Sequence, residues 1–321
     1  MKKNKKAFSL IEVIFVLVIL GIVASLASQI IVQVYENYII QKSIYKVNTK
    51  TELVANEIAN RLTYRIQGTT ISKDHIKFLN GTATDTDWLP IEDVQTGGTK
   101  YTTIEWIGYD NDSFASHATP NWSGVANYET ASQNGFETPG SNLDNVANII
   151  SNLSNGRVDL SDGNHSAAVL FMHNENYYNS SDEYNPLCMG MIPELLATSN
   201  TDCIFPVVND TNKTFAFTTT TAHPAIVPKI ITERYKLAWS AYAIAPEDLD
   251  GDGHFDLVLY SNYQPWNGDS YLNATRHVLM KNLSVFKFSE NGGTLRFKIC
   301  AVEQIGPDNN ISSCKVKVVI R

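Results

Sequence analysis

Residues 248–256 contain the clearest ligand-binding pattern in the chain. The segment reads Asp-Leu-Asp-Gly-Asp-Gly-His-Phe-Asp, so carboxylates stand at alternate positions, Asp248, Asp250 and Asp252. A glycine after the third carboxylate permits the sharp turn that lets such side chains converge on one cation, and Ca²⁺ prefers oxygen ligands of this kind. The carbonyl of His254 and the carboxylate of Asp256 complete the expected set. The segment therefore predicts a structural Ca²⁺ site.

The twelfth position of this loop limits the expected affinity. It is Leu259 and not the bidentate glutamate of an EF-hand, and a strand is expected to follow the loop. We therefore expect a dissociation constant of about 10⁻⁴–10⁻³ M. The alternative is a polar turn rich in Asp and Gly. Neighbouring carboxylates repel one another unless a cation joins them, which favours the metal.

The cysteines predict covalent cross-links and not metal ligation. There are four of them, at Cys188, Cys203, Cys300 and Cys314, and none has C-x-x-C spacing. Four cysteines allow three pairings. If nearest neighbours pair, each short ring stabilises the fold by about 3 kcal/mol. Free buried thiols are the alternative, and an oxidising compartment would favour disulfides.

A single carboxylate, Glu12, stands at the start of an apolar N-terminal segment. No charge occurs from Val13 to Tyr35, a stretch that as a helix, at about 1.5 Å rise per residue, is long enough to span a bilayer. A carboxylate in hydrocarbon costs about 2.5–3.5 kcal/mol or more, so something must offset that cost. The segment is preceded by four lysines expected to stay in the cytoplasm, Lys2, Lys3, Lys5 and Lys6.

Residues 7–12, Ala-Phe-Ser-Leu-Ile-Glu, resemble the N-terminal signature of type IV pilins and pseudopilins. The resemblance implies that a prepilin peptidase cuts between Ala7 and Phe8 and methylates the new amine. Glu12 would then be the fifth residue of the mature chain. The family's usual residue before the cut is Gly, so Ala7 is a departure, and the family's frequent later Pro is Gln29 here. The resemblance covers residues 1 to 45.

Removal of the leader would also create a cation that can offset the free-energy cost of burying the Glu12 carboxylate. Phe8 would then carry a free α-amine at membrane depth, and a buried anion needs a cation. Pairing of Glu12 with the amine of a neighbouring subunit would neutralise both groups and fix the axial stagger between subunits. Two alternatives are a secretory signal peptide cut near residues 25–27 and an ordinary single-pass anchor. Neither of them explains Glu12.

The apolar pattern continues beyond the membrane at helical spacing. Most steps are three, four or seven residues, and no proline occurs before Pro90. Gly68 is a suitable end. We therefore predict one helix over residues 8–67, which spans the membrane over about 13–35 and is amphipathic in its second half. The apolar positions are Ile40, Ile44, Val47, Val54, Ile58, Leu62 and Ile66.

The remainder, residues 68–321, predicts a β-rich globular head. Residues 110–165 are mostly Asn, Ser, Asp, Gly and Thr, and we predict long surface loops there with one short helix over 142–153. With the leader 1–7 and the helix 8–67, the fold class is α+β, a long helix packed on a mainly antiparallel sheet. The expected strands are 101–107, 167–172, 226–244, 255–260, 278–288, 295–302 and 315–320, with a hairpin turn at Asn291-Gly292-Gly293.

Composition and motifs narrow the function. The formal net charge is −8, and the basic residues cluster only in the leader, so nucleic-acid binding is not predicted. The sequence has no H-E-x-x-H, G-x-S-x-G, P-loop or Rossmann motif, and we predict that the protein is not an enzyme.

The resemblance implies a structural subunit, a minor pilin or pseudopilin, of a type IV pilus or type II secretion filament. Its implied partners are other such subunits, prepilin peptidase and an inner-membrane assembly platform. The implied location is the bacterial inner membrane, single-pass with a cytoplasmic N-terminus and a periplasmic head, and then the filament or cell surface. The alternative is a filament-displayed adhesin or ligand-binding head.

Overall fold

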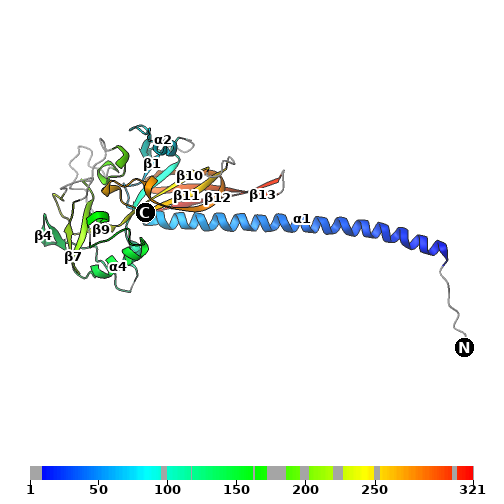
Figure 1. The fold of residues 1–321 in the computed structure, drawn as a ribbon, viewed down its shortest axis with the longest axis horizontal. Coiled ribbons are helices and arrows are strands. Elements are labelled where there is room, and N and C mark those ends of the chain that lie inside the picture. The colour runs from blue at the N-terminus through cyan, green and yellow to red at the C-terminus, as the bar shows by residue number, and fades with distance from the viewer. Residues whose placement is uncertain are drawn as a thin grey trace, which may run out of the picture.

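The computed structural model describes residues 9–94, 100–116, 118–161, 163–171, 186–195, 202–219, 227–248, 254–305 and 309–320. One long helix, α1 (Leu10–Thr63), projects from a β-rich head, and its N-terminal end lies far from the head (Figure 1). The predicted α+β class, a long apolar helix packed with antiparallel sheets, is confirmed. The leader 1–7 and Phe8 lie outside the described residues.

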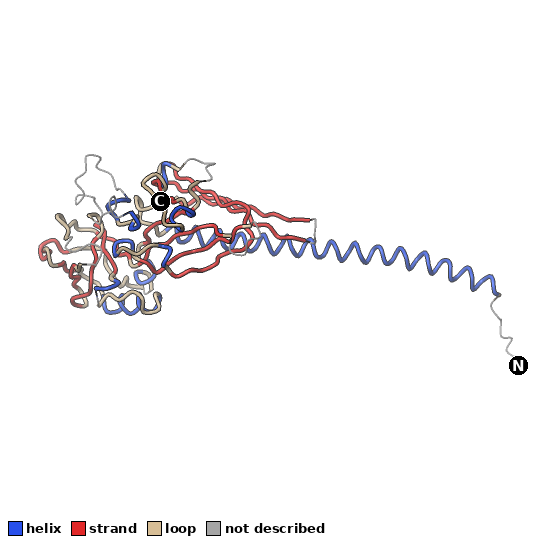
Figure 2. Tube along the Cα trace, turned by 45° about the horizontal axis from the view of Figure 1, so that its top comes forward, coloured by secondary structure: helices blue, strands red, loops and turns tan. Residues whose placement is uncertain are grey.

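An eight-stranded antiparallel sheet forms the part of the head that packs against α1. The strand order is β14-β13-β12-β11-β10-β3-β1-β2, and the last three strands along the chain form the longest ribbons (Figure 2). The strands are β1 (Ile71–Lys73), β2 (Trp88–Pro90), β3 (Thr103–Gly108), β10 (Ser240–Glu247), β11 (Phe255–Tyr263), β12 (Thr275–Asn291), β13 (Thr294–Ile305) and β14 (Asn309–Val319).

A second antiparallel sheet, of six strands, is inserted into the first. Its order is β4-β5-β8-β7-β6-β9, and all of its strands lie between β3 and β10, which are neighbours in the larger sheet. In Figure 1 this inserted part occupies the end of the molecule farthest from the N-terminus. The strands are β4 (Asn127–Ser132), β5 (Gly135–Glu137), β6 (Ala167–Phe171), β7 (Phe205–Thr211), β8 (Thr214–Phe217) and β9 (Tyr235–Ala238).

The short helices and 3-10 turns lie in the connections between strands. The helix predicted over 142–153 is confirmed, because α4 spans Leu143–Leu153. The Asn142 side chain caps its N-terminus. The α-helices are α2 (His75–Leu79), α3 (Asn111–Phe114) and α4 (Leu143–Leu153). The 3-10 turns are η1 (Ile91–Asp93), η2 (Gly163–His165), η3 (Pro186–Met189), η4 (Pro193–Leu195), η5 (Pro265–Asn267) and η6 (Tyr271–Asn273).

The prediction that residues 110–165 consist of surface loops with one helix is wrong for the hairpin β4–β5. β4 is an edge strand whose side chains are half-buried or exposed, so it lacks the apolar alternation that marks a strand in sequence. On β5, only Phe136 is fully buried, and it packs among the aromatic side chains of the inserted sheet.

The C-terminal end of α1 lies before the predicted one, at Thr63. The Tyr64 N–H bonds the carbonyls of Arg61 and Leu62, and the next residues already pair with β3. The Ile66 N–H donates to the Ile107 carbonyl at 2.8 Å. An N–H that donates to a strand carbonyl cannot also form the helical hydrogen bond, so the helix ends before Gly68.

Each face of the larger sheet is covered by a different layer. The residues Trp106 of β3 and Leu259 of β11 face α1, whereas Ile107 and Val258, their neighbours in sequence, face the opposite layer. On the helix side, α1 contributes a buried stripe at helical spacing, which consists of Val47, Thr51, Ala55, Ile58 and Leu62. The opposite layer contains the segment around η3 and η4.

Two disulfides are present, as predicted, and nearest neighbours pair. The Cys188–Cys203 bond links η3 to the residue Cys203, and both cysteines are buried in the layer opposite α1. Cys300 and Cys314 are ladder partners on β13 and β14, and their Cα atoms are 4.1 Å apart. The described residues contain no free cysteine.

Candidate functional site

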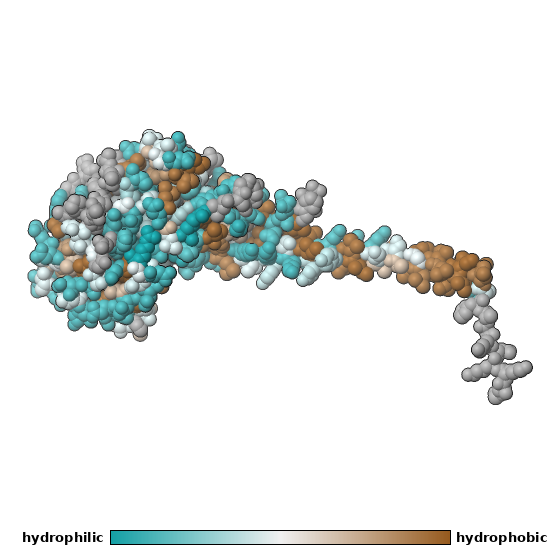
Figure 3. Space-filling view, viewed as in Figure 1, coloured by the Kyte–Doolittle hydropathy of each residue, from teal (hydrophilic) through white to brown (hydrophobic). Residues whose placement is uncertain are grey.

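The first half of α1 is an apolar rod that no other described part of the chain covers. The apolar side chains from Leu10 to Val34 are exposed, and the window most suited to crossing a membrane has none of its residues buried (Figure 3). In the described part of the chain, α1 is the helix long and apolar enough to span a membrane. Exposed apolar surface of this length requires lipid or other apolar helices around it.

The α1 N-terminus is closed by a capping box between Ser9 and Glu12. The Ser9 hydroxyl accepts from the Glu12 N–H at 3.4 Å, and the Ser9 N–H donates to Glu12 Oε2 at 3.1 Å. The box satisfies two backbone donors that would otherwise lack partners at the end of a helix. It also folds the Glu12 carboxylate back onto Ser9, which directly follows Phe8 in the sequence. The groups of the box that contact the carboxylate are uncharged, so the box does not neutralise its charge.

The second half of α1 is fixed to the head by ion pairs as well as by the buried stripe. The Glu52 carboxylate binds the ammonium groups of Lys315, at 3.3 Å, and Lys317 on β14. These lysines, Lys317 first, lower the pKa of Glu52. Lys46 pairs with Glu303 of β13. The exposed apolar rod is therefore held in a defined direction relative to the head.

The predicted Ca²⁺ loop is the connection between β10 and β11. Asp250 and Asp252 lie outside the described residues, so the structure leaves the complete ligand set untested. Within the described part of the chain, no group of three or more His, Cys, Asp or Glu side chains is arranged to hold a metal. Asp248 follows β10 directly, and His254 directly precedes β11. The hairpin therefore brings the two ends of the predicted loop together.

Asp256 is the predicted ligand that the structure describes best. It is 2% exposed, and its Oδ1 accepts from the Asn282 N–H at 3.3 Å. Its Oδ2 is buried and has no hydrogen bond from a described residue, and the Lys281 ammonium lies 3.9 Å away. A buried carboxylate oxygen without a hydrogen bond fits the donor type that Ca²⁺ takes.

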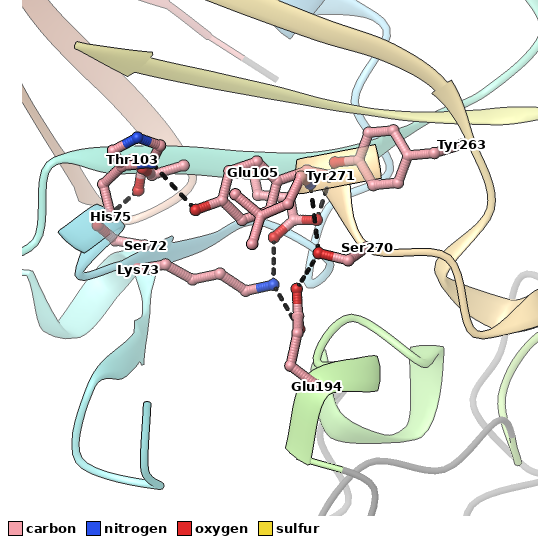
Figure 4. Close-up of polar contacts among 10 residues, drawn as sticks. Ser72, Lys73, His75, Thr103, Glu105, Glu194, Tyr263, Ser270 and Tyr271 are labelled. Carbon is pink, nitrogen blue, oxygen red and sulfur yellow. Dashed lines mark hydrogen bonds and ion pairs between the residues drawn. The ribbon is translucent and has the colours of Figure 1, made fainter. Parts of the chain in front are cut away.

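The sequence did not reveal a buried polar cluster around Lys73, whose contacts are drawn in Figure 4. It lies on the face of the larger sheet opposite α1. Lys73 of β1 is fully buried, and its Nζ is 2.7 Å from Glu105 Oε2 of β3 and 3.2 Å from Glu194 Oε2 of η4. The Tyr263 hydroxyl donates to Glu105 Oε1 at 2.8 Å. The Ser270 hydroxyl donates to Glu194 Oε1. One cation is thus shared by two carboxylates.

Burial and charge act in opposite directions on the two central groups. Burial alone would lower the pKa of the Lys73 ammonium, but the Glu105 and Glu194 carboxylates together raise it. Burial, together with the nearby Glu194 carboxylate, raises the pKa of Glu105, although Lys73 and the Tyr263 hydroxyl act to lower it. The one sequence signal for this cluster was a glutamate in the middle of the apolar strand 101–107. Lys73 gave no such signal, because β1 has three residues and is too short to show the alternating pattern of a strand.

The N-terminal residues match one protein-family model. Residues 2–28 match the prokaryotic N-terminal methylation motif. Comparison with curated proteins and with solved structures finds no match. The motif, together with the long apolar helix that follows it, is consistent with a type IV pilin-like protein.

Proposed function

We propose that this chain is a structural subunit, of the minor pilin or pseudopilin kind, of a type IV pilus or type II secretion filament. The methylation motif supports processing by prepilin peptidase and assembly with other pilin-type subunits. The observation that carries the proposal is the uncovered first half of α1, which is held in a fixed direction by a second half packed on the head. Before assembly, this apolar half spans the inner membrane with the lysines in the cytoplasm.

The proposal gives the Glu12 charge a role separate from helix capping. In the filament, the carboxylate pairs with the Phe8 amine of a neighbouring subunit, as the cost of a lone buried charge requires. Two substitutions separate the roles. Glu12→Gln keeps an oxygen acceptor for the capping box but removes the charge, whereas Ser9→Ala removes the cap but keeps the charge.

The experiment measures filament incorporation of these two variants in the native host. We expect Glu12→Gln, like Glu12→Ala, to be inserted and processed but to remain in the membrane. Ser9→Ala should be incorporated, because a lost cap costs only about 0.5–2 kcal/mol. Incorporation of Glu12→Gln at the wild-type level would refute the role of the charge.

A second candidate function is ligand binding by a head that the filament displays. The inserted six-stranded sheet, at the end of the molecule farthest from the N-terminus, favours it (Figure 1). Alanine substitutions at the exposed β4 residues Tyr128, Glu129 and Thr130 should abolish adhesion but keep incorporation if the inserted sheet is a binding module. Loss of incorporation would instead give the insertion a structural role.

We also propose that the β10–β11 loop binds one structural Ca²⁺ through Asp248, Asp250, Asp252, Asp256 and the carbonyl of His254. The buried Asp256 Oδ2, which has no hydrogen bond, supports this proposal. The ion would join strand ends that carry several carboxylates and so reduce their repulsion.

A further inference from the structure

The Lys73–Glu105 pair has the arrangement of an amine and a carboxyl group poised to react. Lys73 Nζ is 2.7 Å from Glu105 Oε2, so the carboxyl carbon is one covalent bond beyond the contact. Their side chains are 0% and 1% exposed. Residue Ser72, next to Lys73, pairs with Ile104, next to Glu105, so the antiparallel β1–β3 ladder holds the pair in place. Such fixed proximity supplies much of the barrier reduction in intramolecular reactions.

Two further side chains contact the reacting groups in the positions that amide formation needs. The Tyr263 hydroxyl donates to Glu105 Oε1, the oxygen that would carry negative charge after attack on the carboxyl carbon. The Glu194 carboxylate lies 3.2 Å from Lys73 Nζ and can take and return a proton. Ser270 donates to the other Glu194 oxygen and orients it. Figure 4 shows these side chains converging from β1, β3, β11 and η4.

Burial opposes the two charges of the pair, whose side chains are 0% and 1% exposed. Two aromatic rings act in the other direction and stabilise the cation, because the Lys73 ammonium lies 4.8 Å from the centre of the Phe78 ring and 5.3 Å from that of the Tyr271 ring. A buried ion pair recovers its desolvation cost only in part. Conversion of the Lys73–Glu105 pair to an amide removes two buried charges and leaves Glu194 as the partly exposed carboxylate, with 19% of its side chain accessible.

We propose that Lys73 and Glu105 condense to an intramolecular isopeptide bond, with Glu194 as proton carrier and Tyr263 as the donor to the oxyanion. The Lys73 ammonium first gives one proton to Glu105 Oε2, which yields an amine and a carboxylic acid. The amine nitrogen then attacks Glu105 Cδ, and Tyr263 stabilises the negative charge on Oε1. A second proton passes from nitrogen through Glu194 to Oε2. The Cδ–Oε2 bond breaks, one water leaves, and no oxidant or co-reactant is needed.

If the chain is a filament subunit, as proposed above, tension on α1 reaches the head first at β1, where the bond would lie. α1 leads directly to β1 through residues 64–70, and the hydrogen bonds of β1 to β2 and β3 span only three residues. A covalent link between β1 and β3 would keep this short strand in the sheet when the helix is pulled.

Peptide mapping of the native full-length protein tests the proposal directly. In a tryptic digest, a modified Lys73 resists cleavage, so residues 66–77 should appear as one chain joined to residues 101–157. The branched peptide should have the summed mass of its two chains less one water. Fragmentation should locate the bond between Lys73 and Glu105. Recovery of free peptides 66–73 and 101–157 alone, without the branched species, would overturn the proposal.

Variants then test the assigned roles. Glu194→Gln leaves both reacting groups but removes the proton carrier, and Tyr263→Phe removes the hydroxyl donor. We expect the branched peptide to be lost in Glu194→Gln and to form about 10²–10³ times more slowly in Tyr263→Phe, as for loss of one oxyanion donor. Lys77→Arg is the matched control and should form the bond at the wild-type rate.

Folding of each variant is checked separately, by formation of the Cys188–Cys203 disulfide and by a cooperative thermal transition. A folded Glu194→Gln variant with a wild-type level of branched peptide would contradict the role of Glu194. A branched peptide joining Lys73 to Glu194 would contradict the assignment of Glu105 as the acceptor.

Discussion

Glu247 and Asp256 lie directly opposite each other as the last ladder pair of the β10–β11 hairpin, at the base of the Asp-rich loop. Like charges opposite each other in a sheet are destabilising. Glu247 is compensated by the Arg276 guanidinium, whereas the cation that pairs with Asp256 in the described part of the chain, the Lys281 ammonium, lies 3.9 Å away. The loop therefore begins at a point where one more cation would be stabilising.

Calcium should accordingly raise the unfolding temperature of the protein. With a dissociation constant of about 10⁻⁴–10⁻³ M, a concentration of about 10 mM Ca²⁺ adds roughly 1.4–2.7 kcal/mol to the free energy of unfolding. Thermal unfolding with Ca²⁺ and with excess EGTA measures the effect. Asp252→Asn should abolish the shift, and Asp93→Asn, a change of the same type at an exposed acid of η1, should keep it. An equal midpoint in both buffers would rule out the site.

Truncation of one α1 side chain in the helix–sheet core should destabilise the head strongly. Leu62 is 0% exposed, and a leucine-to-alanine change in a core costs about 2–5 kcal/mol because it leaves a cavity. Leu53 on the same helix is 64% exposed, so Leu53→Ala provides the same chemical change without a cavity. Its cost should stay within about 0.5 kcal/mol. Denaturant unfolding of the detergent-solubilised protein compares the two, and similar costs would contradict the packing of α1 on the sheet.

Asp110 should make stability depend on pH. It caps α3 through the Ser113 N–H at 3.0 Å, and burial raises its pKa from 3.8 to about 6 against the hydrogen bonds from Ser113. Because the folded state then binds the proton more tightly than the unfolded state, stability falls as pH rises from about 4 to 6 and stays lower above that range. The shift corresponds to roughly 3 kcal/mol at about 1.4 kcal/mol for each pKa unit.

Asp110→Asn isolates this effect, because asparagine caps helices as well as aspartate does. The variant should lose this component of the pH dependence and be more stable than the wild type at pH 7. Free energies of unfolding measured from pH 4 to pH 7 check the prediction. Parallel profiles for the two proteins would show that the Asp110 carboxylate carries no such cost.

The sequence predicted the elements whose signals are local. The long apolar run and its continuation at helical spacing located α1, and the turn at Asn291-Gly292-Gly293 located the β12–β13 hairpin, where both glycines have positive φ. That the four cysteines form disulfides was also predicted, whereas the choice among the three pairings was left open and is given by the structure.

The features that the sequence did not reveal depend on long-range pairing. β3 and β10 are ladder partners although the whole inserted sheet separates them in the chain, and no local pattern reports such a pairing. The same holds for the buried cluster. Lys73 and Glu194 come from a three-residue strand and a 3-10 turn, and only the folded layers bring them together.

The N-terminus of the mature protein tests the central claim most directly. Mass spectrometry of the protein purified from filaments or membranes should show a chain that begins at Phe8 with a methylated α-amine and lacks residues 1–7. That product contains the amine which the Glu12 carboxylate requires. A mature chain that begins at Met1 or at Ser28 would contradict a pilin-type subunit.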